Sequence, residues 1–220
     1  MRIAASLLVV AVLSACERPA EPSAPAAAPA PPAASVPPVA PQPAARPATP
    51  AATTITPDGL GPVRIGMSQA EALAALGDDW SLGGTMEPDD PGACRHIIAG
   101  GDEGGPLAYM LNQGRVTRVS VDVSGAQAAP PVRSERGVGL GSTEDDVRRA
   151  YGDQLRSEPH HYTEAPARYL TVWTRGGPTR DDEFVQSADA RGIRFVTDER
   201  RRVVAIIAGD STLQYVEGCS

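Results

Sequence analysis

Residues 65–77 read IGMSQAEALAALG and residues 140–152 read LGSTEDDVRRAYG, so one short pattern occurs twice, 75 positions apart. Aligned with each other, they share both glycines, a hydroxyl residue and an acidic residue. Ser68 and Thr143 are favoured helix N-cap residues, and the acidic residue three positions after each has the spacing of a capping box. The closing glycine of each segment can adopt the left-handed conformation that ends a helix. The sequence therefore predicts one short helix in each segment.

Apolar runs after each predicted helix indicate strands. Three follow the first helix and three follow the second, at residues 94–100, 107–113, 115–123, 168–174, 193–198 and 202–209. In the second and third runs apolar and polar residues alternate, as in antiparallel strands with one buried face. We therefore expect an α+β fold in which a helix-plus-antiparallel-meander unit occurs twice, at residues 55–130 and 131–220. The units should form one sheet with both short helices on one face.

The repeated motif resembles that of a known group of proteins. It consists of Gly-Met, then Ser or Thr, then an acidic or amide residue three positions later, ahead of a short helix closed by glycine. Gly66–Gly77 follows it well, and Gly141–Gly152 follows it with Ser142 in place of the methionine. The pattern resembles the repeat of β-lactamase inhibitory protein and of the small outer-membrane assembly lipoproteins of the BamE/SmpA type. This resemblance implies a protein-binding scaffold without catalytic activity.

Residues 1–16 have the pattern of a bacterial lipoprotein signal peptide. Arg2 precedes an apolar run, Ile3–Ala15, that is shorter than a membrane-spanning helix, which needs about 20 residues. The run ends in Leu-Ser-Ala-Cys, which resembles the lipobox whose cysteine, here Cys16, becomes the lipidated first residue of the mature chain. Glu17 follows in place of the aspartate that marks retention in the inner membrane. We therefore expect a lipid-anchored outer-membrane protein whose folded head lies in the periplasm.

Residues 17–54 are rich in proline and alanine. They contain 12 of the chain's 22 prolines and few side chains that a core would bury. Burial in such a segment does not offset the loss of chain entropy on folding, so we expect a disordered linker with semi-rigid polyproline stretches. The linker would separate the anchor from the head.

Composition and missing motifs exclude several functional classes. The formal net charge is −7 at pH 7, which argues against nucleic-acid binding because phosphates require a basic face. All 20 basic residues are arginine, and the absence of lysine excludes a P-loop, a Schiff-base lysine and a Ser-Lys dyad. The sequence contains no G-x-S-x-G nucleophile elbow. The acidic run Asp181–Glu183 lacks the pattern of a calcium loop and is interpreted as a solvated loop. No cofactor is expected.

Two cysteines remain once Cys16 is assigned to lipidation. Cys94 and Cys219 are an even pair in an oxidising compartment, and we expect them to form a disulfide. The bond would tie the C-terminal residues to the strand at 94–100. A reactive or metal-binding pair is the alternative, but neither cysteine has a second cysteine at short spacing.

The motif PHHYTE at residues 159–164 is the main candidate for metal chemistry. His160 and His161, with Glu158 and Glu164, offer imidazole and carboxylate ligands that zinc accepts. Adjacent histidines on a strand point to opposite faces, and only His96 remains elsewhere to complete such a site. A small metal-assisted periplasmic enzyme that uses the His160 and His161 region is therefore the alternative function.

Aromatic residues are few, so their positions are informative. Those that can in part line an open sheet face are Trp80, Tyr109, Tyr162, Tyr169, Trp173, Phe184 and Tyr215. Exposed aromatic side chains commonly anchor protein partners. Tyr109 and Trp173 lie in strand middles, which favours a place in the core, whereas Tyr162 lies outside the strand pattern. The candidate binding residues are Tyr162, Tyr169 and Trp173.

The predicted sheet leaves one face without helices. A contiguous apolar patch exposed on such a face usually marks a contact surface. We therefore expect the binding site on the face opposite the helices, together with the loops around Tyr162 and residues 176–190. The predicted function is a non-enzymatic protein-binding module, either an assembly accessory or an enzyme inhibitor. Its partner is expected to be another envelope or extracellular protein.

The lipid anchor can be tested at Cys16. The change Cys16→Ser should abolish incorporation of a radiolabelled fatty acid and block normal processing of the signal peptide, because the thioether to diacylglycerol forms only on that sulfur. Metabolic labelling followed by gel electrophoresis measures both effects. Equal labelling of parent and variant would contradict the lipoprotein assignment.

Overall fold

The computed structural model of the chain describes residues 53–83, 92–99, 105–123, 128–180 and 183–219. All of them belong to one compact unit, Pro47–Ser220. The predicted signal peptide with Cys16, and the predicted linker as far as residue 52, lie outside the described residues. Within the described ranges, no helix has the length and apolar character that crossing a membrane requires.

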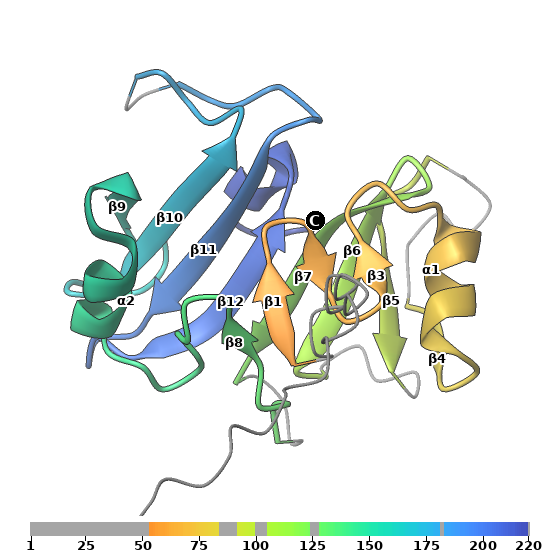
Figure 1. The fold of residues 1–220 in the computed structure, drawn as a ribbon, viewed down its shortest axis with the longest axis horizontal. Helices are drawn as coiled ribbons and strands as arrows, with labels where there is room; N and C mark the ends of the chain where they lie inside the picture. Colours follow the sequence, from red (N-terminus) through yellow and green to blue (C-terminus); the bar gives the residue numbers. More distant parts are fainter. Residues whose placement is uncertain (1–52, 84–91, 100–104, 124–127, 181–182, 220) are drawn as a thin grey trace, which may run out of the picture. The chain divides into compact units, whose positions relative to one another are not determined.

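An eight-stranded sheet forms the larger layer of this unit (Figure 1). In spatial order its strands are β4 (Trp80–Leu82), β5 (Arg95–Ala99), β6 (Leu107–Asn112), β7 (Arg115–Asp122), β12 (Val203–Gly209), β11 (Arg191–Thr197), β10 (Arg168–Arg175) and β9 (Leu155–Pro159). All neighbouring strands are antiparallel. β7 and β12 pair at the centre, and β4 and β9 form the two edges.

A four-stranded sheet and two helices form the second layer. The small sheet contains β3 (Val63–Arg64), β2 (Gly59–Leu60), β1 (Thr54–Thr56) and β8 (Arg133–Ser134), in that order. Its β1 and β8 are parallel, and its other pairs are antiparallel. The helices of this layer are α1 (Gln69–Leu76) and α2 (Glu144–Tyr151), and the described chain also contains the 3-10 helices η1 (Gly152–Gln154) and η2 (Ser211–Gln214). Figure 1 shows the small sheet between α1 and α2.

The hydrophobic core lies between the two layers. The second layer contributes the buried side chains Ile55, Leu60, Val63, Ala72, Val147 and Tyr151. The large sheet contributes alternate residues of its strands, among them Leu170 and Val172 on β10 and Ile193 and Phe195 on β11. The ring centroids of Tyr151 and Phe195 lie 5.3 Å apart, and this contact joins α2 to β11 of the large sheet.

The fold class predicted from the sequence, α+β with a duplicated helix-plus-meander unit forming one sheet, is wrong. The fold is mostly β-structure in two sheets, one of which is mixed, and its two α-helices have eight residues each. The six predicted strand segments all lie in the larger sheet. The strands of the small sheet have only two or three residues, which is too short for a hydrophobic period. The edge strands β4 and β9 contain no fully buried residue, so no apolar run in the sequence predicted them either.

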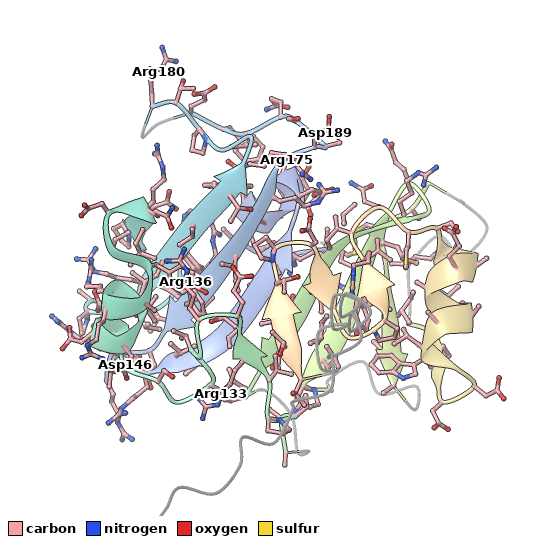
Figure 2. All side chains as sticks on the ribbon, viewed as in Figure 1. Arg133, Arg136, Asp146, Arg175, Arg180 and Asp189 are labelled. Carbon is pink, nitrogen blue, oxygen red and sulfur yellow. A yellow bond between two sulfur atoms is a disulfide. The ribbon has the colours of Figure 1, made fainter. Side chains whose placement is uncertain are left out.

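The two predicted α-helices are present, and each begins with a capping box. Ser68 Oγ accepts from Glu71 N at 3.3 Å, and the Glu71 carboxylate accepts from Ser68 N at 2.8 Å. Thr143 and Asp146 make the same reciprocal pair at 3.1 and 2.9 Å. The hydrogen bonds from Thr143 and Arg149 lower the pKa of Asp146, which is labelled in Figure 2, to about 2. A glycine with positive φ follows each helix.

A disulfide joins Cys94 to Cys219, the pair expected from the sequence. The two residues are 125 positions apart, and their Cα atoms are separated by 5.3 Å. Cys94 immediately precedes β5, whereas Cys219 follows β12 and η2. The bond therefore ties the end of the chain across the large sheet, from β12 to β5.

The contribution of the disulfide can be measured on the oxidised protein. The two sulfurs should be unreactive toward thiol reagents until a reductant is added. Reduction should then lower the free energy of unfolding by roughly 4–5 kcal/mol in the chain-entropy model, because the closed loop is long. Denaturant melts with and without reductant measure this loss, and the double change Cys94→Ser and Cys219→Ser should reproduce it. Free thiols in protein isolated from an oxidising compartment would contradict the assignment.

Candidate functional site

The candidate site lies on the face of the eight-stranded sheet that points away from the core, here called the outer face. Strand alternation places on this face the residues between the core positions. On β10 these are Tyr169, Thr171 and Trp173, and on β11 they include Arg194. Arg118 on β7 has the same orientation. This is the face on which the sequence predicted binding.

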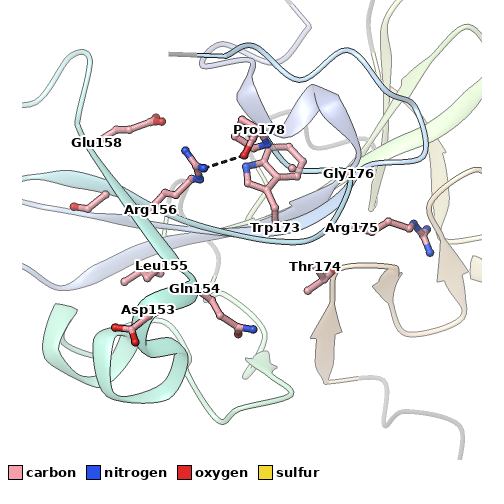
Figure 3. A pocket seen from close by; sticks show the side chains of 12 residues that line it. Asp153, Gln154, Leu155, Arg156, Glu158, Trp173, Thr174, Arg175, Gly176 and Pro178 are labelled. Carbon is pink, nitrogen blue, oxygen red and sulfur yellow. Dashed lines mark hydrogen bonds between the residues drawn. The ribbon is translucent and has the colours of Figure 1, made fainter. Parts of the chain in front are cut away.

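Trp173 lines two hollows. The larger, of about 810 Å³, runs along the β9 edge, and Figure 3 shows Arg156 there beside the indole of Trp173. Arg156 Nη2 donates to the carbonyl of Pro178 at 2.9 Å, so this arginine also fixes the loop after β10. The smaller hollow, of about 250 Å³, opens on the outer face and is lined in part by Trp173, Phe184, Arg194 and Arg156. Trp173 itself is half-buried.

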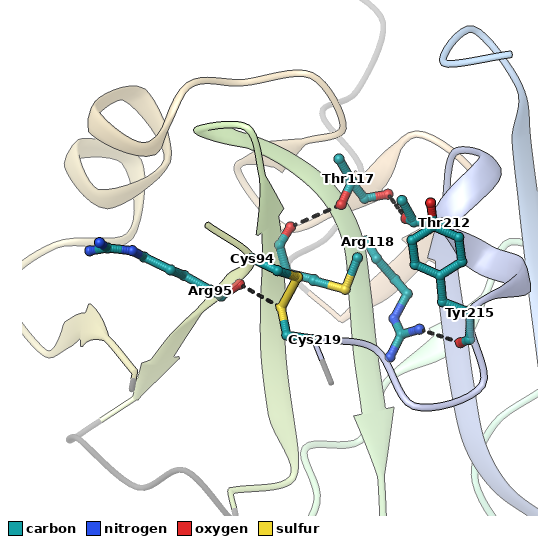
Figure 4. The surroundings of a disulfide bond; sticks show 8 residues. Cys94, Arg95, Thr117, Arg118, Thr212, Tyr215 and Cys219 are labelled. Atoms are coloured by element: carbon teal, nitrogen blue, oxygen red, sulfur yellow. Dashed lines mark hydrogen bonds between the residues drawn. A yellow bond between two sulfur atoms is a disulfide. The ribbon is translucent and has the colours of Figure 1, made fainter. Parts of the chain in front are cut away.

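The C-terminal segment covers part of the outer face, which the sequence predicted to be open. Arg118 Nη1 donates to the carbonyl of Tyr215 at 2.9 Å, and the disulfide at Cys219 holds the last described residues against β5 (Figure 4). Leu213 of η2 is fully buried. A Cβ at Gly192 would lie 2.9 Å from Leu213 Cδ2, so the glycine makes room for this contact. The C-terminal segment therefore hides these parts of the strands from a partner.

The loop after β9 also reaches over the outer face. His160 Nδ1 accepts from the backbone N–H groups of Tyr162 and Thr163 at 3.1 and 3.0 Å, and its ring stacks on Tyr169 with centroids 4.6 Å apart. The Tyr162 hydroxyl donates to the Glu217 carboxylate, and this hydrogen bond raises the pKa of Tyr162. The loop and the C-terminal segment therefore meet above the sheet.

Three exposed aromatic side chains gather where these segments meet, and we call them the aromatic cluster. Tyr162, Phe184 and Tyr215 are 69%, 51% and 40% exposed. The rings of Phe184 and Tyr215 are stacked with centroids 6.3 Å apart and an interplanar angle of 14°. Tyr162 and Tyr215 both line a hollow of about 480 Å³ beside the disulfide. The cluster comes from three separate parts of the chain.

Two arginines are buried beneath this cover. Arg118 is 8% exposed, and its Nε has no hydrogen-bond partner. Burial, together with repulsion from Arg194, lowers the pKa of Arg118 to about 10. Arg194 Nε donates to Thr171 Oγ1 at 2.9 Å, and its guanidinium lies 4.9 Å from the ring of Tyr169 and 3.8 Å from Glu158. The floor of the site is therefore cationic, and its positive charge is only partly neutralised.

The three predicted binding residues differ in how far their side chains are exposed. Tyr162 is exposed in the aromatic cluster. Trp173 is half-buried on the outer face and is not part of the core that its place in a strand middle favoured. Tyr169 is buried between His160 and Arg194, so it supports the floor of the site and offers no surface to a partner.

The histidines of the PHHYTE motif have structural contacts. Among the described residues, no three His, Cys, Asp or Glu side chains are grouped to hold a metal ion. His160 Nδ1 already accepts two hydrogen bonds, and His161 lines the hollows near Tyr162. Asp181 and Asp182 lie outside the described residues, while the Glu183 carboxylate accepts from Thr179 N and Oγ1 at 2.7 and 2.6 Å.

Sequence reasoning missed both buried arginines. Arg118 and Arg194 occupy the polar positions of alternating strands, where an arginine is ordinarily exposed to water. They are buried because residues 160–163 and 211–219 fold back over the outer face. No local sequence pattern predicts that these residues cover the sheet.

No protein-family model, curated protein or solved structure matches this chain. The resemblance to the inhibitory and assembly proteins named above therefore rests on the sequence motif alone.

The loop that carries Tyr162 should respond to pH through His160. Burial, and to a lesser degree the charge of His161, lower the pKa of His160 below its ordinary value of about 6.5. The folded state thus favours the neutral ring, so His160 stabilises the loop fully above about pH 6.5 and less as pH falls through the lowered pKa. NMR titration should show the amide signals of Tyr162 and Thr163 moving with the His160 imidazole. In His160→Ala that transition should disappear, and amides that do not follow His160 would contradict this role.

Proposed function

We propose that this chain is a lipid-anchored envelope protein whose folded head binds another protein and catalyses no reaction of its own. The observation that carries the proposal is the aromatic cluster of Tyr162, Phe184 and Tyr215. Aromatic side chains contribute large contact areas at a low cost in side-chain entropy and are enriched among the residues that dominate binding energy.

The contacts of the cluster support this role. Phe184 and Tyr215 stack on each other, and Tyr162 is tied to Glu217 two residues after Tyr215. The rings are therefore held in place before any partner arrives, which reduces the entropy lost on binding.

The hollow of about 250 Å³ beside Phe184 supplies a recess next to these rings. Phe184, Val216 and Trp173 give it apolar walls, and Arg194 lies at its floor. A partner side chain that enters it would lose water on several sides, as hot-spot residues do. The arrangement fits an assembly accessory or an inhibitor that occupies the surface of an envelope or extracellular protein.

The proposal is tested by comparing two exposed apolar positions. A photo-crosslinking amino acid at Phe184 should capture a defined protein in membranes, whereas the same group at Val123, which is 56% exposed at the end of β7, should not. Phe184→Asp should cost about 2 kcal/mol of binding, roughly thirtyfold in affinity, while Val123→Asp leaves affinity unchanged. Circular dichroism checks that both variants fold.

Equal crosslinking at the two positions would contradict the proposed surface. A partner whose capture survives Phe184→Asp and is lost only on changing His160 and His161 would favour the enzymatic alternative over the binding module.

A further inference from the structure

A hollow of about 390 Å³ between β8 and α2 is lined by basic side chains. We call it the arginine hollow and define it by Arg133, Arg136, Arg149, Ser142 and Asp146. Figure 2 labels Arg133, Arg136 and Asp146 in this region. Three cations and one carboxylate lie together here on a chain whose net charge is −7. This concentration of positive charge is opposite in sign to the molecule as a whole.

Neutral acceptors hold two of the three guanidinium groups. Arg136 donates to Ala150 O at 2.7 Å and to Gln154 Oε1 at 3.2 Å, and its Cζ lies 4.8 Å from the ring centroid of Tyr151. Arg133 donates from Nη1 to Gly137 O at 2.9 Å. No described carboxylate forms an ion pair with either group. Both cations are therefore oriented but not neutralised.

The single carboxylate of the hollow is already committed. Asp146 Oδ2 accepts from Thr143 N and Oγ1 at 2.9 and 2.7 Å, and Asp146 Oδ1 accepts from Arg149 Nη1 at 2.7 Å. Ser142 Oγ accepts from Gly139 N at 3.1 Å, which leaves its O–H free to donate into the hollow. The hollow therefore offers positive charge, guanidinium N–H groups and the Ser142 hydroxyl to a ligand. Its one carboxylate, Asp146, is engaged in capping α2.

From this geometry we propose that the arginine hollow binds a phosphate group of a membrane lipid headgroup. Guanidinium groups match the oxygens of phosphate in pairs of parallel hydrogen bonds, and fixed guanidinium groups lose little entropy when they do so. A tetrahedral phosphate also accepts from more than two donors at once, which suits Arg133, Arg136 and Ser142 together.

The position of the hollow identifies the membrane as the source of the phosphate. Arg133 lies in β8, where it pairs with Thr54 of β1, and its backbone N–H donates to Thr53 O at 2.9 Å. Thr53 is the first described residue, so the chain enters the described fold beside the backbone of Arg133, one of the residues that line the hollow. This step rests on the proposed lipid anchor at Cys16, since an anchored chain would keep the head close to the lipid surface, where the charges of the hollow can turn this side toward it. Basic side chains then add a second attraction to anionic headgroups.

Arginine modification by phenylglyoxal tests the site in the full-length chain. The protein is mixed with vesicles of phosphatidylcholine, with vesicles that also contain phosphatidic acid, or with inorganic phosphate, and modification of each arginine is read by mass spectrometry. On anionic vesicles Arg133 and Arg136 should react several-fold more slowly than on phosphatidylcholine, while Arg180 should not change. Arg136→Gln should weaken protection of Arg133 roughly fivefold, the effect of one basic residue near an anionic surface. The matched change Arg180→Gln should leave that protection intact.

Each outcome decides between defined alternatives. Protection by inorganic phosphate without protection by anionic vesicles would overturn the lipid source. Equal modification under all three conditions would overturn the phosphate site. If the Cys16→Ser variant takes up as much fatty acid as its parent, the lipid anchor is removed from the proposed function. If anionic vesicles still protect Arg133 and Arg136 in that variant, the phosphate site stands.

Discussion

The hydrogen bonds between β7 and β12 hold together two parts of the chain that are distant in sequence. Asp122 pairs with Ala205, and Arg118 pairs with Gly209. A Cβ at Gly209 would lie 2.4 Å from Thr117 O, so only glycine lets β12 close on β7 at this point. The pairing turns two four-stranded arrays into one sheet, and core side chains of the small sheet and of both helices pack against one face of that sheet.

The same pairing explains the cation buried on the outer face. Arg118 lies beside the last residue of β12, and the chain turns immediately afterwards into η2 and passes over it. A buried charge without a counter-charge is costly, and here the carbonyl of Tyr215 is its one acceptor among the described residues. Water would solvate Arg118 better than this cover does. The disulfide at Cys219 opposes that tendency, because it holds the cover in place at its far end.

Local signals predicted local structure well and predicted the covering segments poorly. The capping residues and closing glycines located both α-helices, and apolar runs located six strands of the large sheet, because both signals depend on neighbours in sequence. The small sheet depends on pairing β1 with β8, about which strands of two or three residues carry no information. Tyr162 was recognised as a surface residue because it lies outside any strand pattern. Tyr169 was misjudged because its burial depends on His160, whose loop folds back over β10.

The two proposed surfaces occupy different sides of the large sheet and do not compete for space. The aromatic cluster belongs to segments on the outer face, whereas the arginine hollow belongs to β8 and α2 in the second layer. A head that rests on lipid phosphates through the hollow would therefore present the aromatic cluster away from the membrane, where a protein partner can approach. In this arrangement the chain enters the described fold at Thr53, on the side that would face the membrane. The predicted linker would then serve mainly to let the head rotate, and not to carry it far from the membrane. A short connection would fix the orientation of the head, whereas a long one leaves that orientation to the charges of the hollow.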